Sequence, residues 1–247
     1  MYFLFPLIGL FAGFTGSLLG LGGGIIVVPS LTMLGLNVKT AVAISIFSTI
    51  ATWASASEKY IRSNLVDFKI AFFLGSATTI GAFIGSRVLF IFPEKVIIFI
   101  FVFITLLVLY SNILGLSSDN KTEKFTPIRL IFSYAFMLFA GFISAILGIG
   151  AGVFKVFAMD KILNMPYRVS TATSMFLIGI TASSSAVYYA FNKDLDPFHT
   201  SIVSIGAIIG GLLGSRVMVI LPVKVLRVIF SIVVIALIGS LVFKTLI

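Results

Sequence analysis

Long apolar stretches, separated by short polar segments, run along almost the whole chain. Several of these stretches lack charged residues and come close to the roughly 20 residues that a membrane-spanning helix needs. They predict helices over residues 40–57, 70–86, 96–118, 169–192, 197–215 and 228–243. The pattern therefore predicts an all-α polytopic membrane protein.

Two further stretches are too long for one span each. The first 38 residues contain no charge, and a single helix of that length would measure about 57 Å, nearly twice the ~30 Å of the hydrocarbon core. This stretch must break or fold back, most easily at glycines, because glycine destabilises a helix interior by about 1 kcal/mol relative to alanine. Residues 130–159 form a second apolar stretch that is too long for one span and also contains glycines. The two glycine clusters are Gly20, Gly22, Gly23 and Gly24, and Gly148, Gly150 and Gly152.

The two clusters belong to an internal duplication. Residues 13–24 (GFTGSLLGLGGG) match residues 141–152 (GFISAILGIGAG) at six of twelve positions. Residues 81–96 match residues 210–225 at nine of sixteen. Corresponding glycine-interrupted segments in two homologous halves are typical of secondary transporters. We therefore divide the chain into a first transmembrane repeat (1–116), a polar linker (117–127) and a second transmembrane repeat (128–247).

Basic residues indicate how the halves are oriented, because cytoplasmic loops are enriched in Lys and Arg. If each interrupted stretch is one span, each half has four spans, the halves are parallel (4+4), and the two faces carry nine and eight basic residues. If each stretch crosses as two short pieces, the halves are inverted (5+5) and the faces carry eleven and five, with Lys155 inside the membrane. The eleven are Lys59, Arg62, Lys69, Lys121, Lys124, Arg129, Lys161, Arg168, Arg216, Lys224 and Arg227; the five are Lys39, Arg87, Lys95, Lys193 and Lys244.

We favour the inverted arrangement, with both termini outside, because eleven against five is the asymmetry that cytoplasmic loops show. The parallel arrangement is the alternative. Pieces of about 15 residues are short for a span, and if they dip into the membrane as half-helices the parallel arrangement returns.

Composition agrees with a membrane protein and limits its chemistry. The chain is 60% hydrophobic and 10% charged, with a mean hydropathy of +1.21, whereas about a quarter of the residues of a soluble domain are charged. Cysteine is absent, which excludes disulfides and thiolate metal sites. The net charge of +9 is scattered over short connections, which suits the inner face of a membrane better than nucleic acid. We expect a multi-pass protein of the cell (inner or plasma) membrane with no cofactor, no metal and no nucleic-acid partner, whose oligomeric state is open.

The motifs resemble the TauE/SafE family of sulfite and organosulfonate exporters, also called the toluene sulfonate uptake permease family. The resemblance rests on the paired glycine-rich segments 13–29 and 141–155, on KTAVAIS (39–45) and YRVSTATS (167–174), and on the doubled GSRV before a proline. It implies a secondary transporter of sulfite, a sulfur-containing organic anion or another small anion. The substrate, the direction of transport and the coupling ion stay open.

The glycine clusters are candidate anion sites. A helix that restarts within the bilayer exposes unpaired backbone N–H groups and the positive end of its dipole, which bind anions without a charged side chain. Pseudo-symmetry would bring both clusters together near the midplane. Alternatively, the glycines only permit close helix packing, a common use of small residues in membranes. The predicted substrate-binding residues are Gly20, Gly22, Gly23, Gly24, Gly148, Gly150, Ala151, Gly152, Lys155, Ser45 and Ser174.

Three of these candidates bring side-chain chemistry. Lys155 is the sole charge within residues 130–159 and has no charged counterpart in the first repeat. An ionisable residue at membrane depth is a functional hypothesis, and Lys155 could neutralise an incoming anion. Alternatively, it snorkels to the interface or pairs with Asp160, five positions away. Ser45 and Ser174 occupy equivalent positions in the two halves and could donate to an oxyanion, or bond back to the preceding helical turn.

Other functions are less well supported. All eight acidic residues fall in loops or at predicted span ends, so no buried carboxylate relay of the kind that proton pumps use is evident. A passive anion channel could use the same dipole-lined site. An intramembrane enzyme is a weaker alternative, because no HExxH motif occurs and the only histidine, His199, follows Asp196 and Pro197 at a predicted helix start, where capping explains it. We expect no catalytic residues.

Overall fold

The computed structural model describes residues 3–88, 126–148, 150–191 and 195–222, with isolated positions between 93 and 110 and between 224 and 235. The described part is helical and contains no strand. Its elements are α1 (Leu4–Leu19), α2 (Gly24–Met33), α3 (Val38–Arg62), α4 (Phe68–Val88), α6 (Pro127–Leu147), α7 (Gly152–Phe157), the π-helical turn η1 (Ala158–Ile162), α8 (Tyr167–Ala190) and α9 (Pro197–Ile220).

The predicted helices are found where the structure describes them. Residues 40–57, 70–86, 169–192 and 197–215 correspond to α3, α4, α8 and α9. Predicted helices 96–118 and 228–243 lie mostly outside the described residues. Helix α3 continues past its predicted end to Arg62. The prediction covered only the uncharged stretch, whereas a helix can continue through charged residues. The last turns of α3 include an i,i+4 ion pair between Glu58 and Arg62, at 2.8 Å, on the exposed surface.

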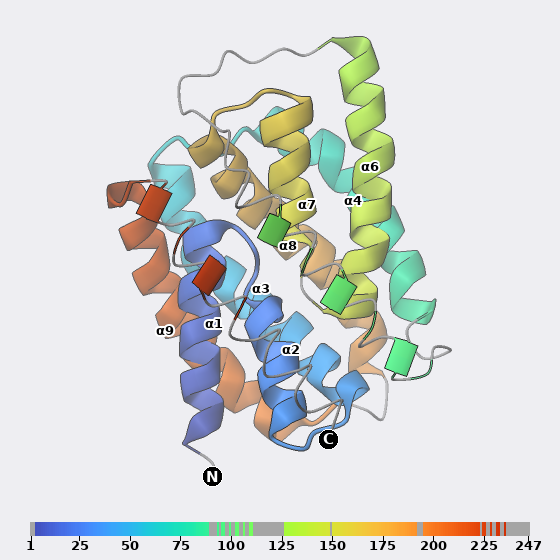
Figure 1. Cartoon of the computed structure of the whole chain (residues 1–247), viewed down its shortest axis with the longest axis vertical. Coiled ribbons are helices and arrows are strands. Elements are labelled where there is room, and N and C mark those ends of the chain that lie inside the picture. The colour runs from blue at the N-terminus through green and yellow to red at the C-terminus, as the bar shows by residue number, and fades with distance from the viewer. Residues whose placement is uncertain are drawn as a thin grey trace.

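Four described helices are long and apolar enough to cross a membrane: α3, α6, α9 and residues Phe68–Arg87 of α4. The described part of the chain is thus helical and has helices of the length and hydropathy predicted for a polytopic membrane protein. Helix α8 has 24 residues and carries a buried series of hydroxyl side chains between apolar ones. It lies between other helices (Figure 1), where Ser174 and Thr181 have hydrogen-bond partners. In the described part of the chain, Ser170 Oγ and Thr171 Oγ1 of the same helix are buried without one.

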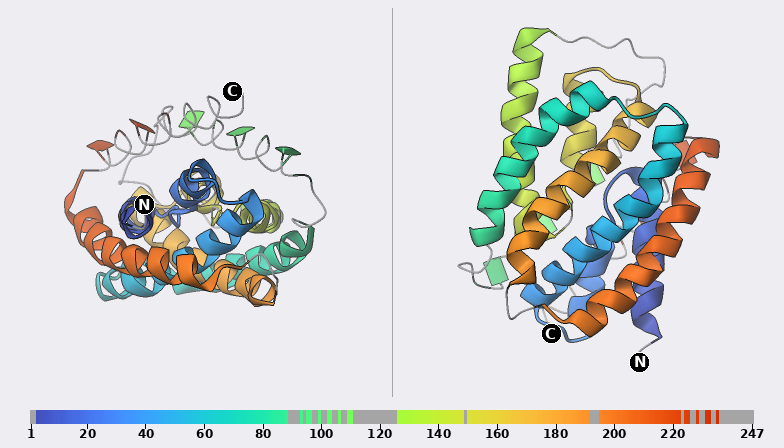
Figure 2. Two further views of the ribbon diagram at one scale, coloured as in Figure 1. Left: turned by 90° about the horizontal axis from the view of Figure 1, so that it is seen from below. Right: turned by 180° about the vertical axis from the view of Figure 1, so that it is seen from behind.

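Helices far apart in the sequence pack closely through glycine. Helix α1 lies along α9, and α4 lies along α6 (Figure 2). A Cβ atom on Gly9 of α1 would lie 2.0 Å from the carbonyl oxygen of Val203, and one on Gly81 of α4 would lie 2.0 Å from that of Leu138. Any side chain there would separate the helices, so glycine sets the close backbone approach. Glycines within these helices therefore have a packing role, and the break glycines Gly20 and Gly23 also approach backbone atoms closely.

Candidate functional site

The first long apolar stretch is interrupted, as predicted. Helix α1 ends at Gly20 (φ 68°, ψ 30°), and α2 begins after Gly23 (φ 75°), with Gly22 between them at φ 83°. These left-handed conformations suit glycine and strain other residues. A Cβ atom on Gly23 would lie 2.6 Å from the carbonyl oxygen of Ala12. The chain therefore folds back, and α2 returns beside α1 (Figure 1).

The second stretch is interrupted in the same way. Helix α6 ends at Gly148 (φ 64°), Gly150 has φ 70°, and α7 begins after Ala151. Ala151 has φ 45°, a left-handed conformation that costs an alanine roughly 1–2 kcal/mol. In the first break, the corresponding position is Gly23. A strained, fully buried residue at this point is a feature that functional sites often show.

The two breaks lie against each other in the interior. A Cβ atom on Gly152 would lie 2.1 Å from the carbonyl oxygen of Gly20 and 2.6 Å from Cα of Leu21. The side chain of Ile178 on α8 would lie 3.0 Å from a Cβ on either Gly22 or Gly150. The structure therefore brings the predicted glycines of both clusters into one buried region.

Hydroxyl groups of α3 and α8 hold the carbonyl groups of the breaks. Ser45 Oγ donates to the Gly148 carbonyl at 2.5 Å. Ser174 Oγ shares its hydrogen between the carbonyls of Gly20, at 2.9 Å, and Gly152, at 3.1 Å. Because these hydrogens are engaged, the two serines position the breaks in this conformation.

Three supporting residues were missed by the sequence analysis as parts of this region. Thr49 Oγ1 donates to the Gly22 carbonyl at 2.6 Å. Tyr60 Oη donates to the Ser17 carbonyl at the end of α1, and Tyr189 Oη donates to the Ala145 carbonyl at the end of α6, at 2.8 Å. Thr49 could have been found, because it follows Ser45 by one helical turn on the same face of α3. The tyrosines gave no such signal, since their acceptors lie more than 40 residues away.

The first turns of the restarting helices keep free N–H groups. In α2, the N–H groups of Ile26 and Val27 donate to the Gly23 carbonyl at 2.9 and 3.2 Å. In the described part of the chain, the N–H groups of Gly24 and Ile25 have no acceptor, and neither does that of Gly152 in α7. Buried donors of this kind at a helix start attract negative charge.

Lys155 lies wholly inside the protein. Its side chain is 0% exposed, and Nζ donates to Thr181 Oγ1 at 2.8 Å and contacts the Leu177 carbonyl at 3.4 Å. Thr181 Oγ1 lies 3.1 Å from Thr78 Oγ1, so this polar chain joins α7, α8 and α4. The snorkelling alternative is therefore wrong. The ion pair of Asp160 in the structure is with Lys161, at 3.5 Å.

Asp160 corrects the expectation that all acidic residues lie in loops or at span ends. It belongs to η1 and is 3% exposed. A π-helical turn of this kind often marks a functional site. The sequence did not indicate that Asp160 is buried, because Asp160 comes directly after the apolar stretch 130–159 and so lay at the expected end of a span.

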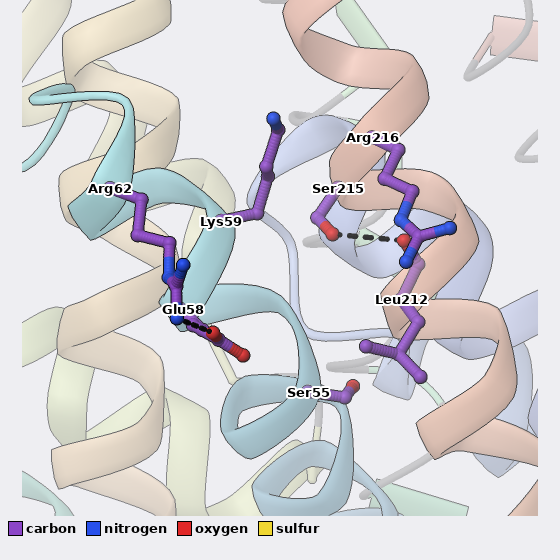
Figure 3. Close-up of a pocket in the computed structure, with 7 residues that line it drawn as sticks. All are labelled: Ser55, Glu58, Lys59, Arg62, Leu212, Ser215 and Arg216. Atoms are coloured by element: carbon purple, nitrogen blue, oxygen red, sulfur yellow. Dashed lines mark hydrogen bonds and ion pairs between the residues drawn. The ribbon is translucent and has the colours of Figure 1, made fainter.

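The two arginines of the doubled GSRV motif lie at helix ends, away from the breaks. Arg87 stacks on the ring of Phe83, 4.2 Å from its centroid. Arg216 lines a surface pocket of about 230 Å³ between α3 and α9 (Figure 3), together with Lys59 and Arg62. One pocket thus joins basic residues of the first and the second half.

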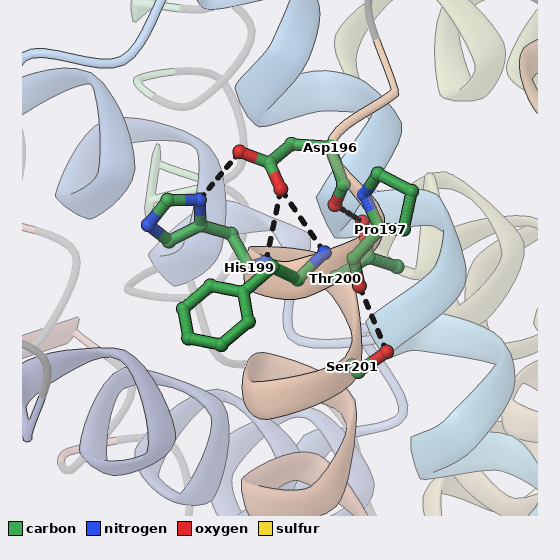
Figure 4. Close-up of polar contacts among 6 residues, drawn as sticks. Asp196, Pro197, His199, Thr200 and Ser201 are labelled. Atoms are coloured by element: carbon green, nitrogen blue, oxygen red, sulfur yellow. Dashed lines mark hydrogen bonds and ion pairs between the residues drawn. The ribbon is translucent and has the colours of Figure 1, made fainter.

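His199 has the capping environment that the sequence indicated. Asp196 Oδ1 accepts from the N–H groups of Phe198 and His199, at 3.0 and 3.2 Å, and Oδ2 lies 2.6 Å from His199 Nδ1 (Figure 4). Burial opposes ionisation of Asp196, but its hydrogen bonds with His199 outweigh burial and hold its pKa below the usual value. The pair begins α9 and takes no part in the breaks.

Comparisons with known proteins show the family to which the chain belongs. The family model described as Sulfite exporter TauE/SafE matches residues 5–241. The chain is 28% identical over 242 residues to the probable membrane transporter protein YunE of Bacillus subtilis (strain 168), covering 87% of this chain and 88% of YunE. It is 25% identical over 199 residues to the probable membrane transporter protein MJ0441 of Methanocaldococcus jannaschii, covering 75% and 71%. No solved structure matches the chain. Because the family match covers nearly its whole length, the chain belongs to the sulfite exporter TauE/SafE family of membrane transporters.

Proposed function

We propose that this protein is a carrier of sulfite or a small sulfur-containing organic anion across the cell membrane, and that it binds the anion where its two helix breaks meet. The observation that supports this most directly is the contact between Gly152, at the start of α7, and Gly20, at the end of α1, which puts the two breaks in one buried region. Free N–H groups lie at both helix starts. Sulfite and sulfonate oxygens are acceptors that such donors suit.

In this proposal, Lys155 supplies the positive charge, and Ser45 and Ser174 hold the two breaks in position. Lys155 Nζ has two uncharged partners, the Thr181 hydroxyl at 2.8 Å and the Leu177 carbonyl at 3.4 Å. An ammonium group has three donors, so one is left for an anion. Ser45 and Ser174 hold break carbonyls away from the anion. The membrane potential would then act on the bound charge with about 2.3 kcal/mol per charge per 100 mV.

We further propose that the two halves are inverted. Helices α1 and α2 have 16 and 10 residues, or about 24 and 15 Å at 1.5 Å per residue, and α2 folds back beside α1. A pair that folds back ends on the face where it started, so it adds two crossings or none to the other three spans of each predicted half, and the number stays odd. The parallel arrangement would need the two pieces to make one crossing together, so the earlier expectation that dipping half-helices restore it does not apply to a folded-back pair. The pocket that joins Lys59 and Arg62 with Arg216 also supports this arrangement, because parallel halves would put Arg216 on the opposite face.

The orientation can be tested with single cysteines, since the chain has none of its own. We expect Lys59→Cys and Arg216→Cys to react with a membrane-impermeant thiol reagent from the same side of right-side-out cells or vesicles. Reaction from opposite sides would contradict inverted halves and leave the anion site open to its own test.

The transport proposal is tested with the purified full chain in proteoliposomes. We expect uptake of a radiolabelled substrate chosen from sulfite, thiosulfate, taurine, isethionate and sulfoacetate, after a thermal-shift screen for binding. An anion of the same kind inside the vesicle should accelerate uptake through a carrier. Saturable flux without this acceleration would indicate a channel and contradict the carrier.

A further inference from the structure

The pocket between α3 and α9 carries positive charge that the transport proposal does not use. Its lining residues are Ser55, Glu58, Lys59, Arg62, Leu212, Ser215 and Arg216. Glu58 is engaged by Arg62 at 2.8 Å. In the described part of the chain, neither Lys59 nor Arg216 has an ion-pair partner. The pocket therefore presents two uncompensated cations from two helices.

The two serines of the pocket do not serve as free donors. Ser55 Oγ donates to the Thr52 carbonyl at 3.0 Å, and Ser215 Oγ donates to the Leu212 carbonyl at 3.1 Å. The free donors are thus the Lys59 ammonium and the Arg216 guanidinium, which Figure 3 shows extending from α3 and α9. This set of donors suits an oxyanion such as a phosphate.

The position of the pocket along α9 connects it to the lipid. A series of exposed apolar residues of α9 recurs at helical spacing on one face, and Arg216 continues that face one turn later, with the exposed Ile220 one further turn on at the end of the helix. The residues of this series are Ile205, Ile208, Ile209, Leu212 and Leu213. In a membrane protein, such a face contacts acyl chains, and a long basic side chain in the last turns of the helix reaches the level of the headgroups.

We propose that this pocket binds the phosphate headgroup of an anionic phospholipid, with Lys59 and Arg216 contacting the phosphate and Leu212 contacting the start of an acyl chain. A volume of about 230 Å³ is smaller than the roughly 300–1,000 Å³ of sites that enclose a whole drug-sized ligand. It suits a headgroup whose chains remain in the bilayer. Basic pockets between membrane helices are known to take such headgroups.

The internal repeat provides a natural control. Arg87 corresponds to Arg216, but the positions that correspond to Lys59 and Arg62 are Tyr188 and Phe191. The other copy therefore has one arginine without a second cation. The lipid site is expected on one face of the membrane only.

The test measures lipid binding to the purified full chain in neutral detergent, by native mass spectrometry and by the thermal midpoint. Phosphatidylglycerol should bind and raise the midpoint, and phosphatidylcholine should do neither. The double variant Lys59→Gln/Arg216→Gln should bind phosphatidylglycerol about 25-fold more weakly, because each basic residue contributes about fivefold. Arg87→Gln/Lys69→Gln, which also removes two exposed charges, should bind like the wild type.

Single variants keep the proposal testable if the double variant does not fold. Lys59→Gln and Arg216→Gln should each weaken binding about fivefold, and Arg216→Lys, which keeps the charge, should weaken it less. Equal binding of the two lipids by the wild type, or equal losses in the Arg87→Gln/Lys69→Gln control, would overturn the proposal. So would an equal rise of the midpoint with inorganic phosphate alone, because that result would assign the pocket to a free anion.

Discussion

Replacing Lys155 by methionine separates a binding role from a structural one. The side chain is fully buried and has a neutral partner. Replacement of a buried charge by an apolar residue of similar volume is often neutral or stabilising. Thr181 also keeps its own acceptor, the Leu177 carbonyl at 2.8 Å. We therefore expect Lys155→Met to change the free energy of unfolding by less than about 1 kcal/mol, or to raise it.

The effect on transport should be much larger. A hydrogen bond to a charged group contributes about 1.5–3 kcal/mol, which corresponds to an affinity loss of roughly 10- to 150-fold. The assay is the concentration dependence of anion uptake in proteoliposomes, measured beside thermal unfolding of the same preparation. Lys69→Met, which removes an exposed lysine at the start of α4, is the control and should change neither quantity.

Two results would refute this reasoning. Unchanged uptake in Lys155→Met would remove the ammonium group from the anion site. A loss of uptake that accompanies destabilisation by more than about 2 kcal/mol would show that Lys155 holds the fold, since buried groups whose removal leaves partners unsatisfied cost that much.

Further substitutions test the geometry of the breaks and of a helix cap. Gly152→Ala should abolish uptake and destabilise the protein, because its Cβ would lie 2.1 Å from a backbone oxygen of the first break, whereas Gly75→Ala, 3.3 Å from the end of a leucine side chain, should be tolerated in both assays. Ala151→Gly should raise the free energy of unfolding by roughly 1 kcal/mol in denaturant titration, because it relieves a left-handed alanine. Ser174→Ala should lower it by about 1–3 kcal/mol, since two buried carbonyls lose their donor. The depressed pKa of Asp196 stabilises the protein above the ordinary aspartate pKa, and this contribution is lost as the pH falls through the folded-state pKa. Asp196→Asn should therefore reduce the fall of the thermal midpoint at acid pH. An unchanged fall would contradict a stabilising role of the Asp196 carboxylate.

The interrupted helices show how much of this fold can be predicted from the sequence. The length of the uncharged stretch before Lys39 required a break, and the intrinsic cost of glycine in a helix located it at Gly20 to Gly23. The second break, between Gly148 and Ala151, follows from the same reasoning. Both are local properties of the chain, because helix length and helix propensity depend on residues close in sequence.

The partners of these breaks were not predictable in the same way. Ser174 was a candidate anion donor in the sequence, but in the structure its hydroxyl is shared between Gly20 and Gly152. Asp160 was expected at a span end and is buried. A hydroxyl or carboxyl group has several possible partners within a few ångströms of any helix, and the choice among them depends on which other helix lies there.

The sequence by itself determined that this is a helical membrane protein with two glycine interruptions, because hydropathy, span length and glycine content act along the chain. The internal repeat predicted that the interruptions come together. Only the tertiary structure decided which of their atoms are in contact, that Lys155 is buried against Thr181, and that Lys59 and Arg216 share a pocket. These relations join residues more than 20 positions apart. They depend on how helices pack, which is set by the close backbone approaches at glycines and by the few polar contacts that the bilayer makes costly to leave unpaired.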